Sequence, residues 1–185
     1  MNIKEINDLK TAVEKGDAKA QYTLGLAYYN GDGVPRNHVE TARLWLLAAK
    51  QGLTFAQCNL STLYASGDGV PQDYQESLKW LRMAADPKQG NNAGAQFNLG
   101  CAYRDGEGVA QDDTEAVKWW RMAAEQGDAE AQHALAKACF GGKGVPQPVT
   151  KSTLLEGVEW LRKSAAQGHA GAKMTLEMLK QQGLI

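Results

Sequence analysis

The chain has 185 residues, of which 43% are hydrophobic and 22% charged, and its 20 basic and 21 acidic residues give a formal net charge of −1 at pH 7. This composition is that of an ordinary globular protein. Without a basic stripe it argues against nucleic acid as a partner, because phosphate binding requires clustered positive charge. The longest apolar run, residues 44–49, is far too short to cross a bilayer, so we expect no membrane insertion.

The first segment, residues 1–17, predicts an amphipathic helix that caps the N-terminal end of the fold. Its apolar side chains recur at helical spacing: Ile3, Ile6, Leu9 and Val13. The segment lacks the apolar core of a signal peptide. We therefore expect a cytoplasmic protein, or a periplasmic or secreted one if a leader has been removed.

One pattern of residues then occurs four times. Each copy begins with Ala-x-Ala-Gln or a close variant and ends its first half with Gly-x-Gly-Val. The copies start at Ala18, Thr54, Ala93 and Ala129, and a partial fifth starts at Ala170, so the starts lie 36, 39, 36 and 41 residues apart. Self-similarity at this period predicts stacked units rather than one closed core. We expect one continuous solenoid domain with repeats 18–53, 54–92, 93–128 and 129–169, followed by a C-terminal capping helix, 170–185.

Each repeat predicts two helices joined by a glycine turn. In the first repeat the apolar spacing predicts helices near 18–30 and 38–50. The turn 31–33 should end the first helix, since glycine tolerates a left-handed backbone. Asn37 can cap the second helix through its side-chain oxygen. Asp73 and Asp112 take the same place in the next repeats, and we expect four glycines to end the second helices: Gly52, Gly90, Gly127 and Gly168.

Small and large residues alternate where the helices should meet. Recurring Ala and Gly allow two helices to approach closely, and large side chains fill the gaps beside those contacts. We interpret four tryptophans as such core residues rather than as a ligand-stacking surface: Trp80, Trp119, Trp120 and Trp160. Two insertions, residues 86–92 and 147–156, predict longer loops, the second because Pro148 and the β-branched pair after it disfavour a helix.

Three motifs occur in this order over residues 18–168: Ala-x-Ala-Gln-Tyr-x-Leu-Gly, Gly-x-Gly-Val-Pro and Ala-x-x-Trp-x-x-x-Ala-Ala-x-x-Gly. The combination resembles the Sel1-like repeat, a relative of the tetratricopeptide repeat. The resemblance implies an all-α fold: an α/α solenoid of four helix-turn-helix repeats with capping helices, wound into a right-handed superhelix with a concave groove. It also implies a noncatalytic scaffold or adaptor, of bacterial origin, that binds a protein or peptide in that groove.

The residues that could carry chemistry form no recognisable set. Three cysteines are an odd number without repeated pairing, which argues against a disulfide framework: Cys58, Cys101 and Cys139. The three histidines show no metal-ligand spacing: His38, His133 and His169. We expect no catalytic residue, no metal and no cofactor. The alternative is an envelope-associated enzyme or peptidoglycan-related protein, as the resemblance to cysteine-rich relatives allows.

The first helices should line the concave face, so their positions outside the core are the candidate binding residues. Ten such residues form the predicted site: Lys19, Leu26, Tyr29, Asn30, Phe55, Thr62, Ser66, Arg104, Asp105 and Lys137. A mixture of aromatic and polar side chains can bind an extended peptide or a partner helix. The competing interpretation is that these side chains are only solvated, or that Leu26 packs internally. An incompletely covered end would also allow a homodimer.

Overall fold

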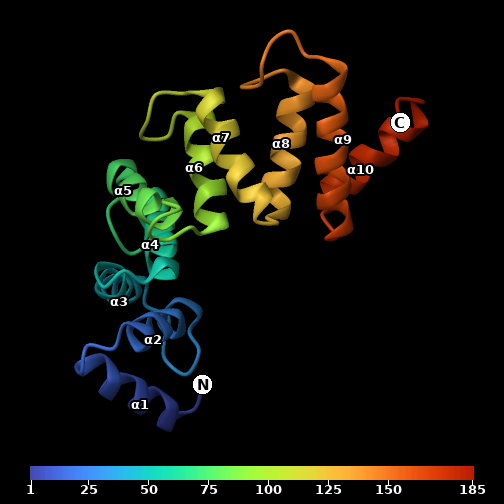
Figure 1. Ribbon diagram of the computed structural model, residues 1–185. Coiled ribbons are helices and arrows are strands. Elements are labelled where there is room, and N and C mark those ends of the chain that lie inside the picture. The colour runs from blue at the N-terminus through green and yellow to red at the C-terminus, as the bar shows by residue number, and fades with distance from the viewer. The chain divides into compact units, whose positions relative to one another are not determined.

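The computed structural model describes residues 1–185 as ten α-helices with no strand, which confirms the all-α class (Figure 1). No helix has both the length and the apolar character needed to cross a membrane. The helices are α1 (Ile3–Glu14), α2 (Ala18–Asn30), α3 (His38–Lys50), α4 (Thr54–Ser66), α5 (Tyr74–Ala85), α6 (Ala93–Asp105), α7 (Asp113–Glu125), α8 (Ala129–Gly141), α9 (Lys151–Ala166) and α10 (Ala170–Gln181).

The chain divides into two compact units, residues 1–92 and 93–185. In the N-terminal unit α2 packs on α3 and α4 on α5, α3 joins the two pairs by packing on α4, and α1 covers α2. In the C-terminal unit α6 packs on α7 and α8 on α9, α7 packs on α8, and α10 covers α9. Each unit is therefore two stacked helix pairs with one extra helix at a chain end, as the repeat pattern predicts.

Most of the predicted helix ends lie at the turn and cap residues that the sequence indicates. Gly31 and Gly67 follow their first helices with φ of +75°, and Gly142 has φ of +65°. The predicted caps are confirmed, because the side chains of Asn37, Asp73 and Asp112 accept backbone N–H hydrogen bonds from the first turns of α3, α5 and α7. These local signals place the helix ends correctly because they depend only on adjacent residues.

The prediction for Gly90 is wrong. Helix α5 ends at Ala85, and Gly90 lies within the following loop. Asp86 precedes Pro87, which excludes the helical region for it, and Asp86 has φ −57° and ψ 119°. Its carbonyl oxygen then accepts hydrogen bonds from the loop N–H groups of residues 89–91. The proline therefore ends this helix several residues before the glycine.

The predicted loop over 147–156 is too long. Helix α9 already begins at Lys151, and the Thr150 hydroxyl caps it by accepting a hydrogen bond from the Thr153 N–H at 3.2 Å. A threonine that disfavours a helix interior is a good helix cap, since its hydroxyl satisfies a free N–H. The non-helical segment between α8 and α9 is residues 142–150.

Three of the four predicted core tryptophans are buried, namely Trp80, Trp120 and Trp160. Trp119 is only half-buried, which corrects the prediction for this residue. Its neighbour Trp120 takes the interior position, because it lies against Gly100 of α6, where no side chain occupies the space. The first repeat has its interior tryptophan at the equivalent place, Trp45 opposite Gly25.

The glutamine of each Ala-x-Ala-Gln motif is buried and connects successive helices. In the C-terminal unit the Gln132 Nε2 donates to the Ala124 carbonyl at 3.1 Å, and the Gln132 Oε1 accepts from the Gln167 Nε2 at 3.0 Å. In the N-terminal unit the Gln57 Nε2 donates to the Ala49 carbonyl at 3.2 Å. The amides of Gln57 and Gln132 therefore join one helix pair to the next.

We expect Gln132→Leu to lower the free energy of unfolding by about 1 to 2 kcal/mol, because two hydrogen bonds are lost and each contributes roughly 1 kcal/mol. Urea unfolding followed by circular dichroism measures this change. Gln181→Leu, at the exposed end of α10, is the control and should change stability by less than about 0.5 kcal/mol. Equal effects of the two substitutions would contradict the role assigned to Gln132.

Candidate peptide-binding surface

The first helices of the repeats, α2, α4, α6 and α8, carry all ten predicted site residues. Nine of them are exposed. Leu26 is half-buried and packs against the core cluster formed by α3, α4 and α5, so it serves the interior as well as the surface. Seven of the ten lie in the N-terminal unit, and Arg104, Asp105 and Lys137 lie in the C-terminal unit. Their role in binding remains a prediction.

In the N-terminal unit, neighbouring rings form a continuous row that we call the aromatic row: Phe55, Tyr22, Trp45, Tyr29 and His38. Successive ring centroids along it are 6.4, 6.1, 5.5 and 5.0 Å apart. Distances of this size place the rings in favourable contact. The row joins two predicted site residues, Tyr29 and Phe55, through Tyr22 and Trp45, which are not among the predicted site residues.

Two rings of the aromatic row, Tyr29 and Phe55, are open to solvent, and its centre is fixed. Trp45 is buried and its Nε1 donates a hydrogen bond to the Tyr22 carbonyl at 3.2 Å. Tyr29 is 38% exposed and Phe55 is 60% exposed. The Asn59 Nδ2 donates to the Tyr22 hydroxyl at 3.3 Å, which holds that ring in place. The arrangement therefore presents rigid aromatic surface to a ligand.

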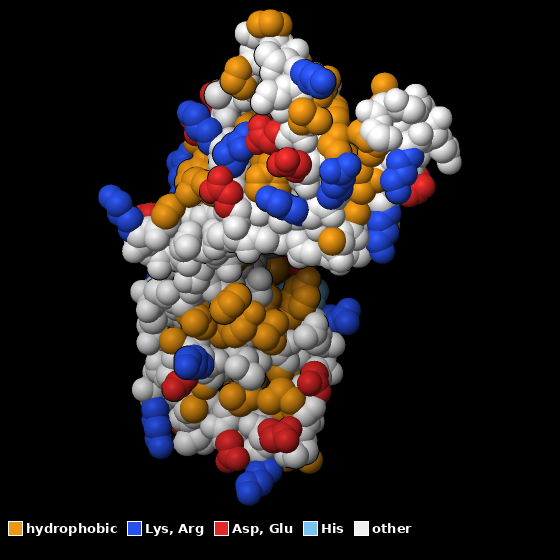
Figure 2. Space-filling model, turned by 45° about the vertical axis from the view of Figure 1, so that its right-hand side comes forward, with side chains coloured by type: hydrophobic (Ala, Val, Ile, Leu, Met, Phe, Trp, Pro, Cys, Tyr) orange, Lys and Arg blue, Asp and Glu red, His pale blue; other side chains and the backbone are white.

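Other predicted residues of this unit contribute less to such a surface. The hydroxyls of Thr62 and Ser66 donate back to carbonyls of their own helix, at 3.4 and 3.0 Å. On the face shown in Figure 2, hydrophobic side chains gather in the middle of the N-terminal unit with charged side chains around them, and charged and hydrophobic side chains are interspersed over the C-terminal unit.

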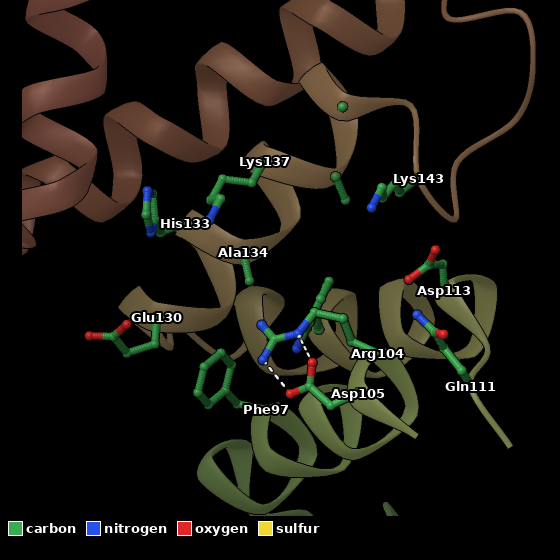
Figure 3. Close-up of a pocket in the computed structure, with 13 residues that line it drawn as sticks. Phe97, Arg104, Asp105, Gln111, Asp113, Glu130, His133, Ala134, Lys137 and Lys143 are labelled. Carbon is green, nitrogen blue, oxygen red and sulfur yellow. Dashed lines mark hydrogen bonds and ion pairs between the residues drawn. The ribbon is translucent and has the colours of Figure 1, made fainter. Parts of the chain in front are cut away.

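The C-terminal unit contains a pocket of about 580 Å³ that includes all three predicted site residues of this unit, Arg104, Asp105 and Lys137. Helices α6, α7 and α8 form its walls, and Figure 3 shows side chains from all three helices around it. Further residues that line it are Phe97, Gln111, Asp113, Trp120, Glu130, His133 and Lys143. Sequence reasoning missed Lys143 because it lies in the Gly-x-Gly turn, outside the helical positions.

Charges in this pocket are partly paired. The Arg104 guanidinium donates to both carboxylate oxygens of Asp105, at 2.7 and 2.6 Å (Figure 3), and this contact holds the pKa of the Asp105 carboxyl below its usual range. The same guanidinium lies 5.7 Å from the ring centroid of Trp120. Lys137 and Lys143 form no ion pair. The pocket therefore holds one neutralised cation and two ammonium groups without an anionic partner.

Two histidines that are 36 residues apart in sequence meet beside this pocket. The rings of His133 and His169 have centroids 4.5 Å apart. The His169 Nε2 lies 3.0 Å from Glu130 Oε2, and its Nδ1 accepts the Ala172 N–H. Burial, and then the positive charges of His169 and Lys137, lower the pKa of His133. The 36 residues between His133 and His169 equal the shortest spacing between repeat starts, and this is the sequence signal that could have predicted their contact.

The cysteines have the character of interior residues. Cys58, Cys101 and Cys139 are unpaired, and burial raises the pKa of each thiol, that of Cys139 to about 11. A thiol with so high a pKa is protonated at neutral pH and is a poor nucleophile. No group of three or more His, Cys, Asp or Glu side chains in residues 1–185 could hold a metal ion.

These stacked helix pairs define a helical repeat protein, and comparison with known proteins identifies its kind. The sequence model of the Sel1 repeat matches residues 18–53, 54–86, 93–128 and 129–169. The chain belongs to the Sel1 repeat family. Proteins of this family typically mediate protein–protein interaction and are generally noncatalytic. No curated protein matches the chain significantly.

Solved structures of similar proteins agree with this assignment. A protective antigen of uropathogenic Escherichia coli strains with the SLR fold is 35% identical over 97% of this chain, with a TM-score of 0.85, and the chain spans only 37% of its length. A Sel1 repeat protein from Oxalobacter formigenes is 33% identical over 96% of this chain, with a TM-score of 0.85 and 68% of its own length covered. A structure from Klebsiella pneumoniae, 19% identical over 93% of this chain and covered over 82% of its own, shares the fold alone, with a TM-score of 0.57.

Proposed function

We propose that this chain is a noncatalytic adaptor module that binds an extended segment of a partner protein on the faces of its first helices. The observation that carries the proposal is the aromatic row, whose two exposed rings, Tyr29 and Phe55, belong to different helices. Membership of a family that typically mediates protein–protein interaction supports it.

The physical reason is that rigid aromatic rings lose little side-chain conformational entropy when a ligand binds to them. Tyr and Trp side chains supply large contact areas and are enriched among the residues that dominate interface energies. Here packing already fixes the rings, so little conformational freedom would be lost when a peptide binds. Asn30, exposed beside Tyr29, can hydrogen-bond to the backbone of an extended peptide.

We expect the double substitution Tyr29→Ala and Phe55→Ala to weaken peptide binding about tenfold or more, because it removes both exposed rings of the row. Peptides selected from a random display library on the unmodified protein serve as ligands, and fluorescence polarisation of labelled copies gives Kd. Circular dichroism verifies that the double variant keeps its helices.

Tyr74→Ala is the matched control. Tyr74 is 37% exposed, almost the same as Tyr29, but it belongs to α5, a second helix. This control should bind the selected peptides as the unmodified protein does. If Tyr74→Ala weakened binding as much as the double substitution, or if the double substitution had no effect, the first-helix face would not be the binding surface.

A further inference from the structure

We infer that Asp68, in the turn after α4, is a positioning residue for the aromatic row: through His38 it fixes the ring of Tyr29, one of the two exposed rings. The inference rests on the proposed function, in which Tyr29 contacts the partner segment. It goes beyond that function, because it makes the orientation of a binding ring in the first repeat depend on the turn of the second. Two observations lead to it, the way His38 is held and the ring that His38 contacts.

The side chain of His38 has a single hydrogen-bond partner in the chain. Its Nδ1 contacts a carboxylate oxygen of Asp68, and its Nε2 is buried without a partner. Because an ionised carboxylate can only accept hydrogen bonds, the His38 Nδ1 carries the proton and donates to Asp68. Removing this carboxylate would leave both nitrogens of the ring without a partner, so Asp68 determines how the His38 ring is oriented.

The turn that carries Asp68 also holds the backbone of His38. A methyl group on Gly69 would overlap the His38 carbonyl group, so the turn and this residue are in direct contact. His38 is the first residue of α3, whereas Asp68 and Gly69 follow α4 in the next repeat. One turn of the second repeat therefore holds both the side chain and the carbonyl group of a residue in the first, which leaves the His38 ring little freedom to move.

The ring that is held in this way is stacked on Tyr29. The centroids of the His38 and Tyr29 rings are 5.0 Å apart and their planes are inclined by only 20°. The other ring beside Tyr29 is that of Trp45, which the core fixes, with a centroid distance of 5.5 Å. His38 is only half-buried, so it needs an anchor that Trp45 does not need. If the anchor at Asp68 is lost, Tyr29 loses one of its two fixed neighbours.

The first repeat offers a matched control for Asp68. Asp32 has the same place in its own Gly-x-Gly turn, but its carboxylate contacts the amino group of Met1 instead of a ring nitrogen. Asp32 also lies much closer to Tyr29 along the sequence than Asp68 does. If the loss of a turn charge were enough to disturb the Tyr29 ring, Asp32 would disturb it more readily. Different effects of the two aspartates would therefore identify the path through His38.

The test is a double-mutant cycle on the intact protein with the peptides selected on its unmodified form. We expect Asp68→Ala to weaken binding about three- to fivefold, because the Tyr29 ring must then be ordered when the peptide binds. In a chain that already carries Tyr29→Ala, Asp68→Ala should change Kd by less than about 1.5-fold, since the two residues act through one contact. Asp68→Asn, whose amide oxygen can still accept from His38, should bind as the unmodified protein does, and so should Asp32→Ala.

A measurement on the free protein examines the same contact without a peptide. Because the Tyr29 ring is stacked on His38, ring currents displace the chemical shifts of its protons from those of an unfolded chain. Asp68→Ala should move these shifts toward the unfolded values, whereas Asp68→Asn and Asp32→Ala should leave them in place. Circular dichroism verifies that each variant keeps its helices.

Unchanged Tyr29 shifts in Asp68→Ala would overturn the inference. So would equal weakening of binding by Asp68→Ala with and without Tyr29, which would mean that Asp68 contacts the peptide directly, or equal effects of Asp68→Ala and Asp32→Ala. Failure of the proposed function is distinguishable, because Tyr29→Ala combined with Phe55→Ala would then leave binding unchanged. The shifts of the free protein would still decide whether Asp68 fixes the ring.

Discussion

Gly144→Ala should lower the free energy of unfolding by about 3 kcal/mol or more, whereas Gly127→Ala should lower it by about 1 to 2 kcal/mol. Both glycines have positive φ, +68° and +97°. The difference lies in the space around them. A methyl group on Gly144 would overlap the carbonyl group of Asp113 and come within 2.9 Å of Val117, while nothing lies within 4 Å of the corresponding position on Gly127.

The Asp113 carbonyl cannot easily move aside. Asp113 is the first residue of α7, so its oxygen belongs to the first turn of that helix. The second glycine of the Gly-x-Gly turn is thus the point at which one repeat rests on the second helix of the preceding repeat. In the N-terminal unit Gly69 has the same contact with the His38 carbonyl, and Gly52 has open space.

Urea unfolding of the two variants gives the comparison, and Gly69→Ala against Gly52→Ala repeats it in the other unit. Because both members of each pair share the strain of a left-handed backbone, their difference isolates the overlap between repeats. A difference below about 0.5 kcal/mol in both pairs would show that the turn glycines serve only backbone conformation.

The sequence predicted the helix pairs and their ends because those features depend on nearby residues. Asn37 and Asp112 cap helices through hydrogen bonds to the next turn, and the first glycine of each Gly-x-Gly turn ends its helix through a positive φ. The error at Gly90 is of another kind: the repeat template placed a helix end there, although Pro87, visible in the sequence, ends the helix sooner. A local signal outweighed the periodic one.

Features that depend on the opposite helix could not be predicted in the same way. Which of Trp119 and Trp120 is buried depends on the absence of a side chain at Gly100, a residue of another helix. The pocket unites Phe97 with Lys143, from a helix and a turn of different repeats. Helical spacing identified Arg104 and Lys137 as surface residues, but it gave no information about the cavity between them.

Gly100→Ala alone should destabilise the C-terminal unit by about 2 to 3 kcal/mol, because its methyl carbon would lie 2.5 Å from the Cδ1 and Nε1 atoms of Trp120. The ring is only 5% exposed, and the same methyl carbon would also lie 3.0 Å from the Ala116 carbonyl oxygen. Trp120→Leu alone should be destabilising as well, since it leaves a cavity against α6. Together the two substitutions should cost clearly less than their sum.

A comparison of the four repeats gives the reason for expecting this coupling. Repeats with glycine in the first helix have tryptophan opposite, as in Gly25 with Trp45. In the second repeat Ser61 stands at the glycine position and Leu81 at the tryptophan position. In the fourth repeat these positions hold Ala136 and Leu161. Combining Gly100→Ala with Trp120→Leu keeps Trp119 in place and so reproduces the fourth repeat's arrangement, in which Trp160 precedes Leu161.

A double-mutant cycle by urea unfolding measures the coupling, which we expect to be about 1 to 3 kcal/mol in favour of the double variant. Gly25→Ala should repeat the clash in the N-terminal unit, whereas Ser61→Ala, in a repeat with Leu81 at the tryptophan position, should have a small effect. Strict additivity at Gly100 and Trp120 would mean that the ring and the glycine are independent. It would then remain unexplained why glycine and tryptophan occur together in two repeats and are replaced together in the other two.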